Sequence, residues 1–438
     1  MTTADSPTTL DQWLDYQQRV HALGVDLGLA RVGEVWRRMG APSLAPVVIT
    51  VGGTNGKGST VAFLEAMLVA AGKRVGCYTS PHLLRYNERV RVGGHDAEDA
   101  QLIAAFELTE QARRAEPTAI VPLTYFEFGT LAALWIFAHS ALDFAVLEVG
   151  LGGRLDAVNI IDADVAIVTT IDLDHQDWLG DSLDAIAREK AGIFRTGRPA
   201  VIADAAAPPA LLESAERVGA RTIVAGRDYR IETGNGGWSL VFSDANFALP
   251  APTLAAPVQS ANAAGAIAAL HALRERIDVP QEALAAGIRN ASVAARLQRF
   301  VRAGDAELVV DVAHNPQAAR VLAQWLAQNP PRGRNWFVFG ALADKDVAGI
   351  VAPLAPLADR WFIASLDGET PRGLPAQEVL VRLGDSIKTG EVEGHAGVAS
   401  ALAAAAVAST EGDRIVAFGS FFVAAAALRW IEDSGTGV

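Results

Sequence analysis

The residues with the clearest chemical meaning form a glycine-rich loop, Gly52-Gly53-Thr54-Asn55-Gly56-Lys57-Gly58-Ser59. Its glycines allow backbone N–H groups to close around phosphate oxygens, and a helix beginning there adds positive potential. Lys57 can reach the β- and γ-phosphates, and the Ser59 hydroxyl can contact Mg²⁺ or a phosphate. The loop departs from the strict phosphate-loop pattern, because Val51 replaces its first glycine and Gly58 its Ser or Thr. The order of strand, glycines, lysine and hydroxyl still indicates phosphate binding rather than an ordinary glycine-rich strand–helix turn.

A second set of polar residues follows apolar runs that are typical of strands. Glu148 ends one such run, and Ser80 and His175 follow two others. In an open parallel sheet, ligands bind beyond the carboxyl ends of the strands, so we expect these residues to converge with Ser59. Oxygen ligands with one imidazole suit Mg²⁺ or Mn²⁺ beside nucleotide phosphates. Taken singly, Glu148 could form a strand-end ion pair and His175 could cap a helix, so the prediction depends on their shared edge.

The elements that must position these residues alternate between β-rich runs and helical patterns, which is typical of a parallel α/β sheet. Continuous apolar runs predict strands buried on both faces. Strands are predicted at 47–51, 75–78, 144–149 and 165–171, and helices at 60–71 and 126–138. A β-rich excursion is predicted over 233–257, followed by a helix at 261–274. Later strands are predicted at 307–312, 336–339, 361–364 and 415–418, and a helix at 401–409.

Composition limits the class of protein. The chain has 438 residues, of which 37 are basic and 50 acidic, and the formal net charge is −13. This balance argues against a protein that coats nucleic acid or an anionic membrane. Half of the residues are apolar, and the length suggests two domains with sizeable cores. The single cysteine, Cys77, excludes a disulfide framework and cysteine-based zinc sites, suits a reducing compartment, and lies in a predicted core strand.

The N-terminal segment lacks a basic region followed by an apolar core, so we expect no secretory signal. The longest uncharged stretches, 128–142 and 415–428, are shorter than the roughly 18 to 20 residues that span a bilayer. We therefore expect a soluble, cytoplasmic protein. No strong self-association signal is present, which favours a monomer.

Other motifs carry less information. Gly150-Leu151-Gly152-Gly153 follows a strand, but Leu155 stands where a dinucleotide-binding pattern needs its third glycine. The sequence contains no GxSxG, HExxH or CxxC motif, so hydrolase and zinc-peptidase functions gain no support. Four histidines belong to no constellation: His21, His139, His271 and His395.

An ordered series of longer motifs runs along the chain: GTNGKGS, SPH with RYNERVRV, TYFEFGT, LEVGLGGRLDAVN, DHQDWLG, EKAGIF and DVAHNP. This series resembles the folylpolyglutamate synthases, within the Mur ligase superfamily of ATP-dependent amide ligases. The resemblance extends from 25–32 (VDLGLARV) to 418–424 (FGSFFVA). The forms TYFE and GGRLDA, with VDLGL upstream, are most similar to the bacterial bifunctional type, which acts as dihydrofolate synthase and extends the polyglutamate tail.

The resemblance implies an α/β protein, with an N-terminal phosphate-loop domain on a mainly parallel sheet and a smaller, Rossmann-like α/β C-terminal domain. Residues 1–293 would bind ATP and pteroate, and residues 294–438 would form the glutamate-ligase domain. The implied reaction adds L-glutamate to dihydropteroate, giving dihydrofolate, and to folyl mono- and polyglutamates, through an acyl phosphate. ATP and two Mg²⁺ sites are the implied cofactors, with K⁺ as a further candidate. Nucleic acid and membrane are not expected partners.

The resemblance also implies roles for individual residues. Lys57, Lys190 and His314 would be catalytic, with Lys190 carrying a carbamate; the residues alone would make Lys190 a solvated helix lysine. Ala294-Ala295 replace the Pro-Gly that usually precedes the linker arginine, which leaves Arg299 as an alternative to Arg296. The ATP set is Thr54, Asn55, Gly56, Lys57, Gly58, Ser59, Asn262, Arg296 and Asp311, and the metal set is Ser59, Ser80, Glu148 and His175. The pteroate set is Gly24, Val25, Asp26, Leu27, Thr124, Tyr125, Phe126, Glu127, Leu155, Asp156 and Ala157.

Two other functions remain open. A Mur-type ligase could act on a different carboxylic acid, although the TYFE segment resembles a pteroate pocket. A phosphate-loop regulatory NTPase could couple nucleotide state to a partner protein, although the chain lacks a guanine-reading NKxD motif.

Overall fold

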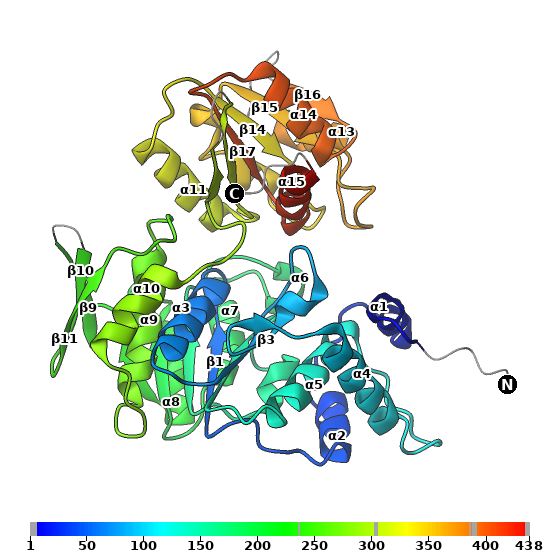
Figure 1. Cartoon of the computed structure of the whole chain (residues 1–438), viewed down its shortest axis with the longest axis vertical. Helices are drawn as coiled ribbons and strands as arrows, with labels where there is room; N and C mark the ends of the chain where they lie inside the picture. Colours follow the sequence, from blue (N-terminus) through cyan, green and yellow to red (C-terminus); the bar gives the residue numbers. More distant parts are fainter. Residues whose placement is uncertain (1–6, 235–236, 302–304, 385–386, 388–391, 434–438) are drawn as a thin grey trace. The chain divides into compact units, whose positions relative to one another are not determined.

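The computed structural model describes residues 7–234, 237–301, 305–384, 387 and 392–433. They divide into two compact units (Figure 1). The first unit comprises Met1–Thr253 and Ser260–Ala291, and the second comprises Leu254–Gln259 and Ser292–Val438. Within the described part of the chain, every helix is too short or too polar to cross a membrane. The assignment of ATP and pteroate binding to 1–293 and of glutamate ligation to 294–438 stays a prediction.

The first unit is built on an eight-stranded sheet with the order β4-β3-β2-β5-β1-β6-β7-β8. The six strands from β2 to β8 run parallel, and β3 and β4 pair antiparallel at one edge. The four predicted strands of this sheet are confirmed, and each is buried along its whole length. The strands are β1 (Val47–Gly52), β2 (Val75–Tyr78), β3 (Val90–Val92), β4 (His95–Asp96), β5 (Phe144–Glu148), β6 (Val165–Val168), β7 (Pro199–Ile202) and β8 (Arg221–Val224).

One of these strands is shorter than its apolar run predicts. Strand β6 ends at Val168, which pairs with Gly52, whereas the run continues to Ile171. The next residues leave the sheet because their hydroxyls bond the glycine-rich loop: Thr169 Oγ1 donates to the Asn55 carbonyl at 2.6 Å. The residues after Val168 therefore bond to the loop and do not extend the sheet.

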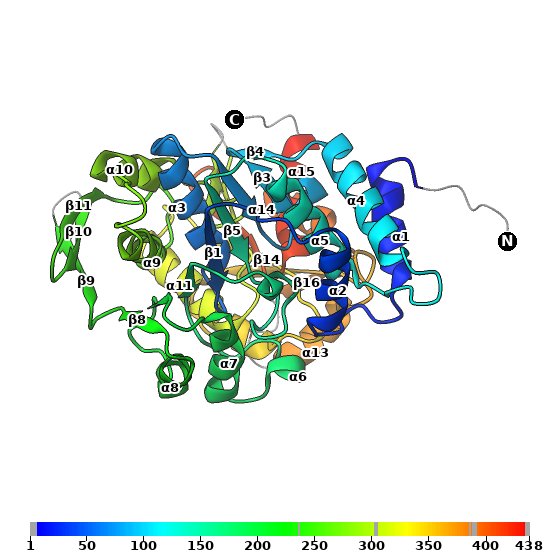
Figure 2. The ribbon, with the colours of Figure 1, turned by 90° about the horizontal axis from the view of Figure 1, so that it is seen from below.

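Helices of the first unit gather on two sides of its sheet. In both views, α1, α2, α4 and α5 lie together on one side, and α9 and α10 lie on the other (Figures 1 and 2). The small antiparallel sheet β11-β10-β9 lies beside α9 and α10, and it confirms the predicted β-rich excursion. Its strands are β9 (Tyr229–Gly234), β10 (Gly237–Phe242) and β11 (Asn246–Pro250). The helices are α1 (Leu10–Val20), α2 (Ala30–Arg38), α3 (Lys57–Ala70), α4 (Asp99–Arg113), α5 (Tyr125–Ala138), α6 (Gln176–Leu179), α7 (Leu183–Lys190), α8 (Pro209–Val218), α9 (Gln259–Ala272) and α10 (Gln281–Asn290).

The second unit has a six-stranded sheet with the order β12-β13-β17-β14-β15-β16, in which only the edge strand β12 is antiparallel. Helices follow most of its strands, as in a Rossmann-like α/β unit. The strands and the helix predicted here are confirmed, although β13 ends two residues earlier than predicted. The strands are β12 (Gln298–Phe300), β13 (Glu307–Val310), β14 (Asn335–Phe339), β15 (Arg360–Ala364), β16 (Val392–His395) and β17 (Arg414–Phe418). The helices are α11 (Pro316–Gln328), α12 (Val347–Val351), α13 (Ala376–Leu383), α14 (Val398–Ala408) and α15 (Phe421–Asp433).

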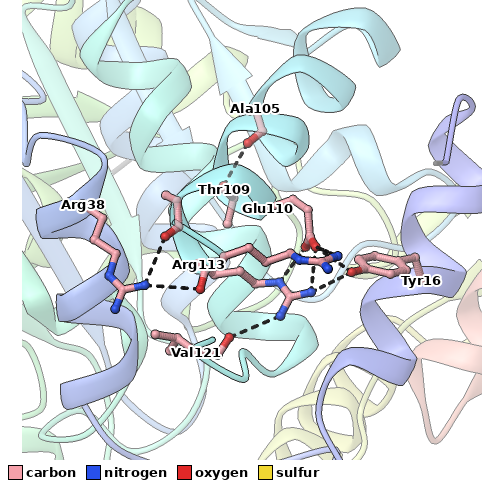
Figure 3. A network of polar contacts seen from close by, with 9 residues as sticks. Tyr16, Arg38, Ala105, Thr109, Glu110, Arg113 and Val121 are labelled. Atoms are coloured by element: carbon pink, nitrogen blue, oxygen red, sulfur yellow. Dashed lines mark hydrogen bonds and ion pairs between the residues drawn. The ribbon is translucent and has the colours of Figure 1, made fainter. Parts of the chain in front are cut away.

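A network of polar contacts fixes the N-terminal helices to α4 (Figure 3). Tyr16 of α1 donates to Glu110 Oε1 at 2.7 Å, and Arg113 donates from Nε to Glu110 Oε2 at 2.6 Å and from Nη2 to the Tyr16 hydroxyl at 2.6 Å. Arg38 of α2 donates to the Arg113 carbonyl at 3.3 Å. Burial and the adjacent Glu110 carboxylate raise the pKa of Tyr16. Because α1 and α2 flank residues 24–27, this network positions one of the predicted pteroate segments.

Glu110→Gln is expected to lower the free energy of unfolding by about 2 to 3 kcal/mol, because it leaves the buried Arg113 guanidinium without its carboxylate. Urea titration followed by circular dichroism measures this change. Glu107→Gln, on an exposed part of the same helix, should change stability by about 0.5 kcal/mol or less. Equal effects of the two substitutions would show that the network contributes nothing specific.

Candidate functional site

The glycine-rich loop connects β1 to α3 and adopts a conformation that only its glycines allow. Gly53 and Gly56 have φ angles of 141° and 88°. A Cβ atom on Gly53 would lie 1.8 Å from Thr169 Oγ1, and one on Gly56 would lie 2.5 Å from Asn262 Oδ1. The loop backbone is also held from outside, since Thr54 N donates to the Thr170 carbonyl at 2.7 Å. The predicted adenine contact, Asn262 on α9, therefore lies directly against the loop.

Two lysines from distant parts of the sequence converge on one carbonyl of this loop. Lys57 Nζ donates to the Gly53 carbonyl at 3.0 Å, and Lys190 Nζ donates to the same oxygen at 2.9 Å. Lys57 also donates to the Thr54 carbonyl at 3.1 Å. The two predicted catalytic lysines are thus adjacent, although nothing in their spacing along the chain indicates it.

Lys190 is not the solvated helix lysine that its residue pattern suggests. It ends α7 and is only 4% exposed. Burial, the larger cause, and repulsion from the Lys57 charge together lower the pKa of Lys190 to about 7. The prediction from the residue pattern was wrong because the last turn of α7 packs under the loop, which is a contact between segments distant in sequence. An amine with this pKa is about half neutral at pH 7, and its neutral form can act as a nucleophile.

The predicted metal residues lie at the carboxyl edge of the sheet. Ser80 N donates to Glu148 Oε2 at 3.1 Å, and a Cβ on Gly58 would lie 3.9 Å from both carboxylate oxygens. Glu148 therefore lies between the end of β2 and the start of α3, where Ser59 is buried. Among the described residues, no group of three or more His, Cys, Asp or Glu side chains could hold a metal. A cation at this edge would need further ligands beside Glu148, such as the hydroxyls of Ser59 and Ser80 and the phosphate oxygens of a bound nucleotide.

His175 enters the same region through the loop that follows β6. It has a left-handed conformation, with φ 51°, and immediately precedes α6. Its Nε2 lies 3.9 Å from Asp174 Oδ2. The loop is tied to the glycine-rich segment, because Thr54 Oγ1 and the Asp172 backbone exchange two hydrogen bonds of 3.1 Å.

The three predicted pteroate segments come together on the α2 and α5 side of the first unit. Arg31 joins two of them: its Nη1 lies 2.7 Å from Asp26 Oδ2, and its Nη2 donates to Glu127 Oε1 at 3.0 Å. Glu127 is oriented by a capping box, since its carboxylate accepts from Thr124 N at 2.8 Å and its own N–H donates to Thr124 Oγ1. Gly24, Val25 and Leu27 lie in the same connection between α1 and α2.

The loop that leads to the third segment meets the second segment at an aromatic ring. Phe126 packs against the backbone of Gly150, where a Cβ would lie 2.6 Å from the ring. Asp156 follows in the same loop and accepts hydrogen bonds from the N–H groups of Leu151 and Val158. Burial raises the pKa of Asp156 to about 6 despite these donors. Leu155 and Ala157 flank it in sequence, and Tyr125 precedes Phe126 at the start of α5.

The predicted residues of the second unit surround Phe421. The Arg296 guanidinium carbon lies 5.6 Å from the Phe421 ring centroid, and the His314 ring lies 5.7 Å from it. Asp311 accepts from the N–H groups of Leu297 and Ala313, which ends β13 early. Burial raises the pKa of Asp311, and the charge of Arg296 opposes this rise.

The structure gives Arg296 and Arg299, the two candidates for the linker arginine, different contacts. Arg299 forms an ion pair with Glu307, which also accepts from Arg414 Nε at 2.7 Å. Arg296 instead lies beside Asp311 and Phe421. Ala295 has a φ of 54°, a left-handed conformation in which glycine has no steric cost. The chain therefore has alanine in a conformation that glycine would adopt without steric cost.

Two residues with apparent functional geometry were not singled out from the sequence. Arg31 and Arg89 both lie inside motifs that carry the resemblance, VDLGLARV and RYNERVRV. Their place inside these motifs is the signal that could have indicated them, since both motifs also carry the resemblance.

Comparisons with known proteins find matches along nearly the whole chain. Residues 51–269 match the Mur ligase middle domain, and residues 295–421 match the glutamate ligase domain of Mur ligases. A dihydrofolate synthase/folylpolyglutamate synthase from Escherichia coli K12 is 41% identical over 99% of this chain and 98% of its own length. The solved structure of E. coli FolC in complex with DHPP and ADP has a TM-score of 0.91 at 40% identity, and the match covers 98% of this chain and all of that chain. A bifunctional folylpolyglutamate synthase/dihydrofolate synthase with Mn, AMPPNP and L-glutamate bound has a TM-score of 0.88 at 39% identity, again over 98% and 100% of the two chains.

Proposed function

The chain belongs to the dihydrofolate synthase/folylpolyglutamate synthase family of Mur ligases, and on this premise we propose how its residues carry out the family's ATP-dependent ligation of glutamate in folate metabolism. The substrates would be dihydropteroate, which gives dihydrofolate, and folyl mono- and polyglutamates. The observation that carries the proposal is the convergence of Lys57 and Lys190 on the Gly53 carbonyl, beside the loop that would cradle ATP.

The reaction must convert a carboxylate, which is a poor acyl donor, into one with a good leaving group. A substrate carboxylate oxygen attacks the γ-phosphorus of ATP, and ADP leaves. The amine nitrogen of L-glutamate then attacks the acyl carbon, loses a proton, and releases phosphate together with that carboxylate oxygen. Phosphoryl transfer depends mainly on positioning and charge neutralisation. Lys57 and the loop from Thr54 to Ser59 are suited to that task, although the Thr54 N–H itself donates to the Thr170 carbonyl.

We assign the metal role to Ser59, Ser80, Glu148 and His175, with Lys190 as a carbamate beside a second Mg²⁺ and K⁺ as a further candidate cofactor. Mg²⁺ at this edge would neutralise charge on the transferring phosphoryl group. The structure fits the carbamate chemically, because a buried amine with a pKa of about 7 is available to add CO₂. The carbamate of Lys190 would be an anion in place of the lysine cation, so the Lys57 charge would attract it rather than repel it.

The remaining assignments concern contacts to the nucleotide, to glutamate and to the pteroate group. Asn262 would contact adenine, and Arg296 and Asp311 would contact ATP from the second unit. His314 would act on the phosphate or glutamate side. The segments Gly24–Leu27, Thr124–Glu127 and Leu155–Ala157 would hold the pteroate group, with Asp156 and Phe126 toward the heterocycle. The chain would act as a monomer.

Product mass tests the proposal. The purified protein is incubated with ATP, Mg²⁺ and L-glutamate, in one reaction with dihydropteroate and in another with a reduced monoglutamyl folate. We expect a gain of one glutamate in both products, with one ADP formed per bond. A gain in only one reaction would restrict the pocket to that acid. ATP hydrolysis without any gain would overturn the proposal and favour a regulatory NTPase, or a ligase that acts on another acid.

A further inference from the structure

We propose that Arg89 forms a carboxylate subsite for the pteroate substrate, between the metal edge and the pteroate segments. This inference rests on the proposed function, because it concerns the acid that the enzyme activates. It comes from a buried cation whose surroundings are neutral.

Arg89 is 8% exposed, and its guanidinium lies among aromatic and imidazole groups. Its Nε donates to His82 Nδ1 at 2.8 Å. Its guanidinium carbon lies 5.3 Å from the Tyr86 ring centroid and 5.7 Å from the Tyr125 ring centroid. Because His82 Nδ1 accepts the hydrogen bond from Arg89 Nε, it carries no proton, and the His82 imidazole in this arrangement is neutral.

Carboxylates near Arg89 are engaged elsewhere. Glu88, the adjacent residue, accepts from the backbone N–H groups of Leu83, Leu84 and Arg85 at 2.7 to 2.8 Å. Within the described part of the chain, no Asp or Glu oxygen lies within 4.0 Å of the Arg89 guanidinium nitrogens, whereas the nearby Arg91 has Glu65 at 2.7 Å. A buried cation without a counter-ion is destabilising, and cation–π contacts offset only part of that cost. The free protein therefore bears a cost that an anionic ligand would remove.

The position of Arg89 indicates which anion would bind. Its carbonyl accepts from Thr79 N at 2.9 Å, which places the residue beside Ser80 at the end of β2. On its other side, it contacts Tyr125 at the start of α5, in a predicted pteroate segment. In an acid bound by that segment, the carboxylate is the group that ATP would activate. The guanidinium offers parallel N–H donors that match a carboxylate.

Binding of two ligands to the wild type and its variants tests the subsite without depending on turnover. Pteroic acid and its carboxamide are titrated by calorimetry against the full-length wild type and Arg89→Met, in the absence of ATP. Wild type is expected to prefer the acid by roughly 10- to 100-fold, since the amide removes the charge that Arg89 binds. Arg89→Met should bind both ligands equally within about twofold. Arg85→Met, in the same segment but with a 67% exposed side chain, is the matched control and should retain the wild-type ratio.

The same acid-to-amide ratio in wild type and Arg89→Met would overturn the subsite. Ligation of glutamate by wild type is measured in parallel, so loss of the subsite and loss of the proposed function are separable results. If Arg89→Met does not fold, Arg89→Lys replaces it, because lysine keeps the charge but loses the two-nitrogen fork. An acid preference reduced several-fold in Arg89→Lys supports the subsite, and an unchanged preference contradicts it.

Discussion

Lys57→Ala is expected to lower kcat for glutamate ligation by roughly 10³-fold or more while the protein remains folded. The lysine lies at the start of α3 with its amine held on the Gly53 and Thr54 carbonyls, where it can follow the phosphates of ATP. Alanine removes that charge where negative charge develops. Because the side chain is only partly buried, the free energy of unfolding should change by about 1 kcal/mol or less. Steady-state kinetics with dihydropteroate and a thermal melt measure both quantities.

Lys73→Ala is the matched control for this experiment. Lys73 follows α3 in sequence but lies at the opposite end of that helix from the loop. Its replacement should leave kcat within about twofold of wild type. Full ATP-dependent ligation by Lys57→Ala would show that the loop does not bind the nucleotide phosphates as proposed.

Lys190→Ala is the second substitution with a large expected effect, again roughly 10³-fold in kcat. It removes the buried amine that would carry the carbamate. In wild type supplied with ¹³C-bicarbonate, we expect a carbamate carbon signal by NMR that is absent from Lys190→Ala and present in Lys73→Ala. A short carboxylic acid such as acetate should restore part of the activity, because it returns an anion to the vacated space.

The pH dependence provides an independent check on Lys190. Its pKa in the folded protein, about 7, is lower than the 10.5 of an unperturbed lysine, so the folded state binds fewer protons than the unfolded state between these values. The free energy of unfolding in CO₂-free buffer should therefore rise with pH from about 7 to 10.5, and Lys190→Met should remove this rise. A ¹³C signal that persists in Lys190→Ala, or a rise that persists in Lys190→Met, would contradict the assignment.

Much of the architecture could be predicted because local pattern and tertiary environment agree. Strands such as Val47–Gly52 and Phe144–Glu148 are continuous apolar runs, and the structure buries them in the centre of a parallel sheet. Polar residues that follow such runs must emerge at one edge, which is why Ser80 and Glu148 could be expected near each other. Their contact through the Ser80 N–H agrees with that reasoning.

What could not be predicted depends on contacts between distant segments. The residues around Lys190 form an ordinary amphipathic helix end, and only packing against the Gly53 carbonyl makes the amine buried. Thr169 and Thr170 continue an apolar run in sequence, yet they leave β6 because the loop needs their hydroxyls. The Arg31 bridge between Asp26 and Glu127 likewise joins residues about a hundred positions apart, and no local pattern contains that information.

We expect the enzyme to activate a substrate carboxylate with ATP and then to transfer the acyl group to glutamate. The most direct measurement uses dihydropteroate labelled with ¹⁸O in its carboxylate, together with ATP, Mg²⁺ and L-glutamate, and determines the isotope content of the phosphate released. One ¹⁸O atom per phosphate, in step with dihydrofolate formed, is the predicted result. Unlabelled phosphate, or label recovered in AMP, would contradict an acyl phosphate and the roles assigned to the residues around it.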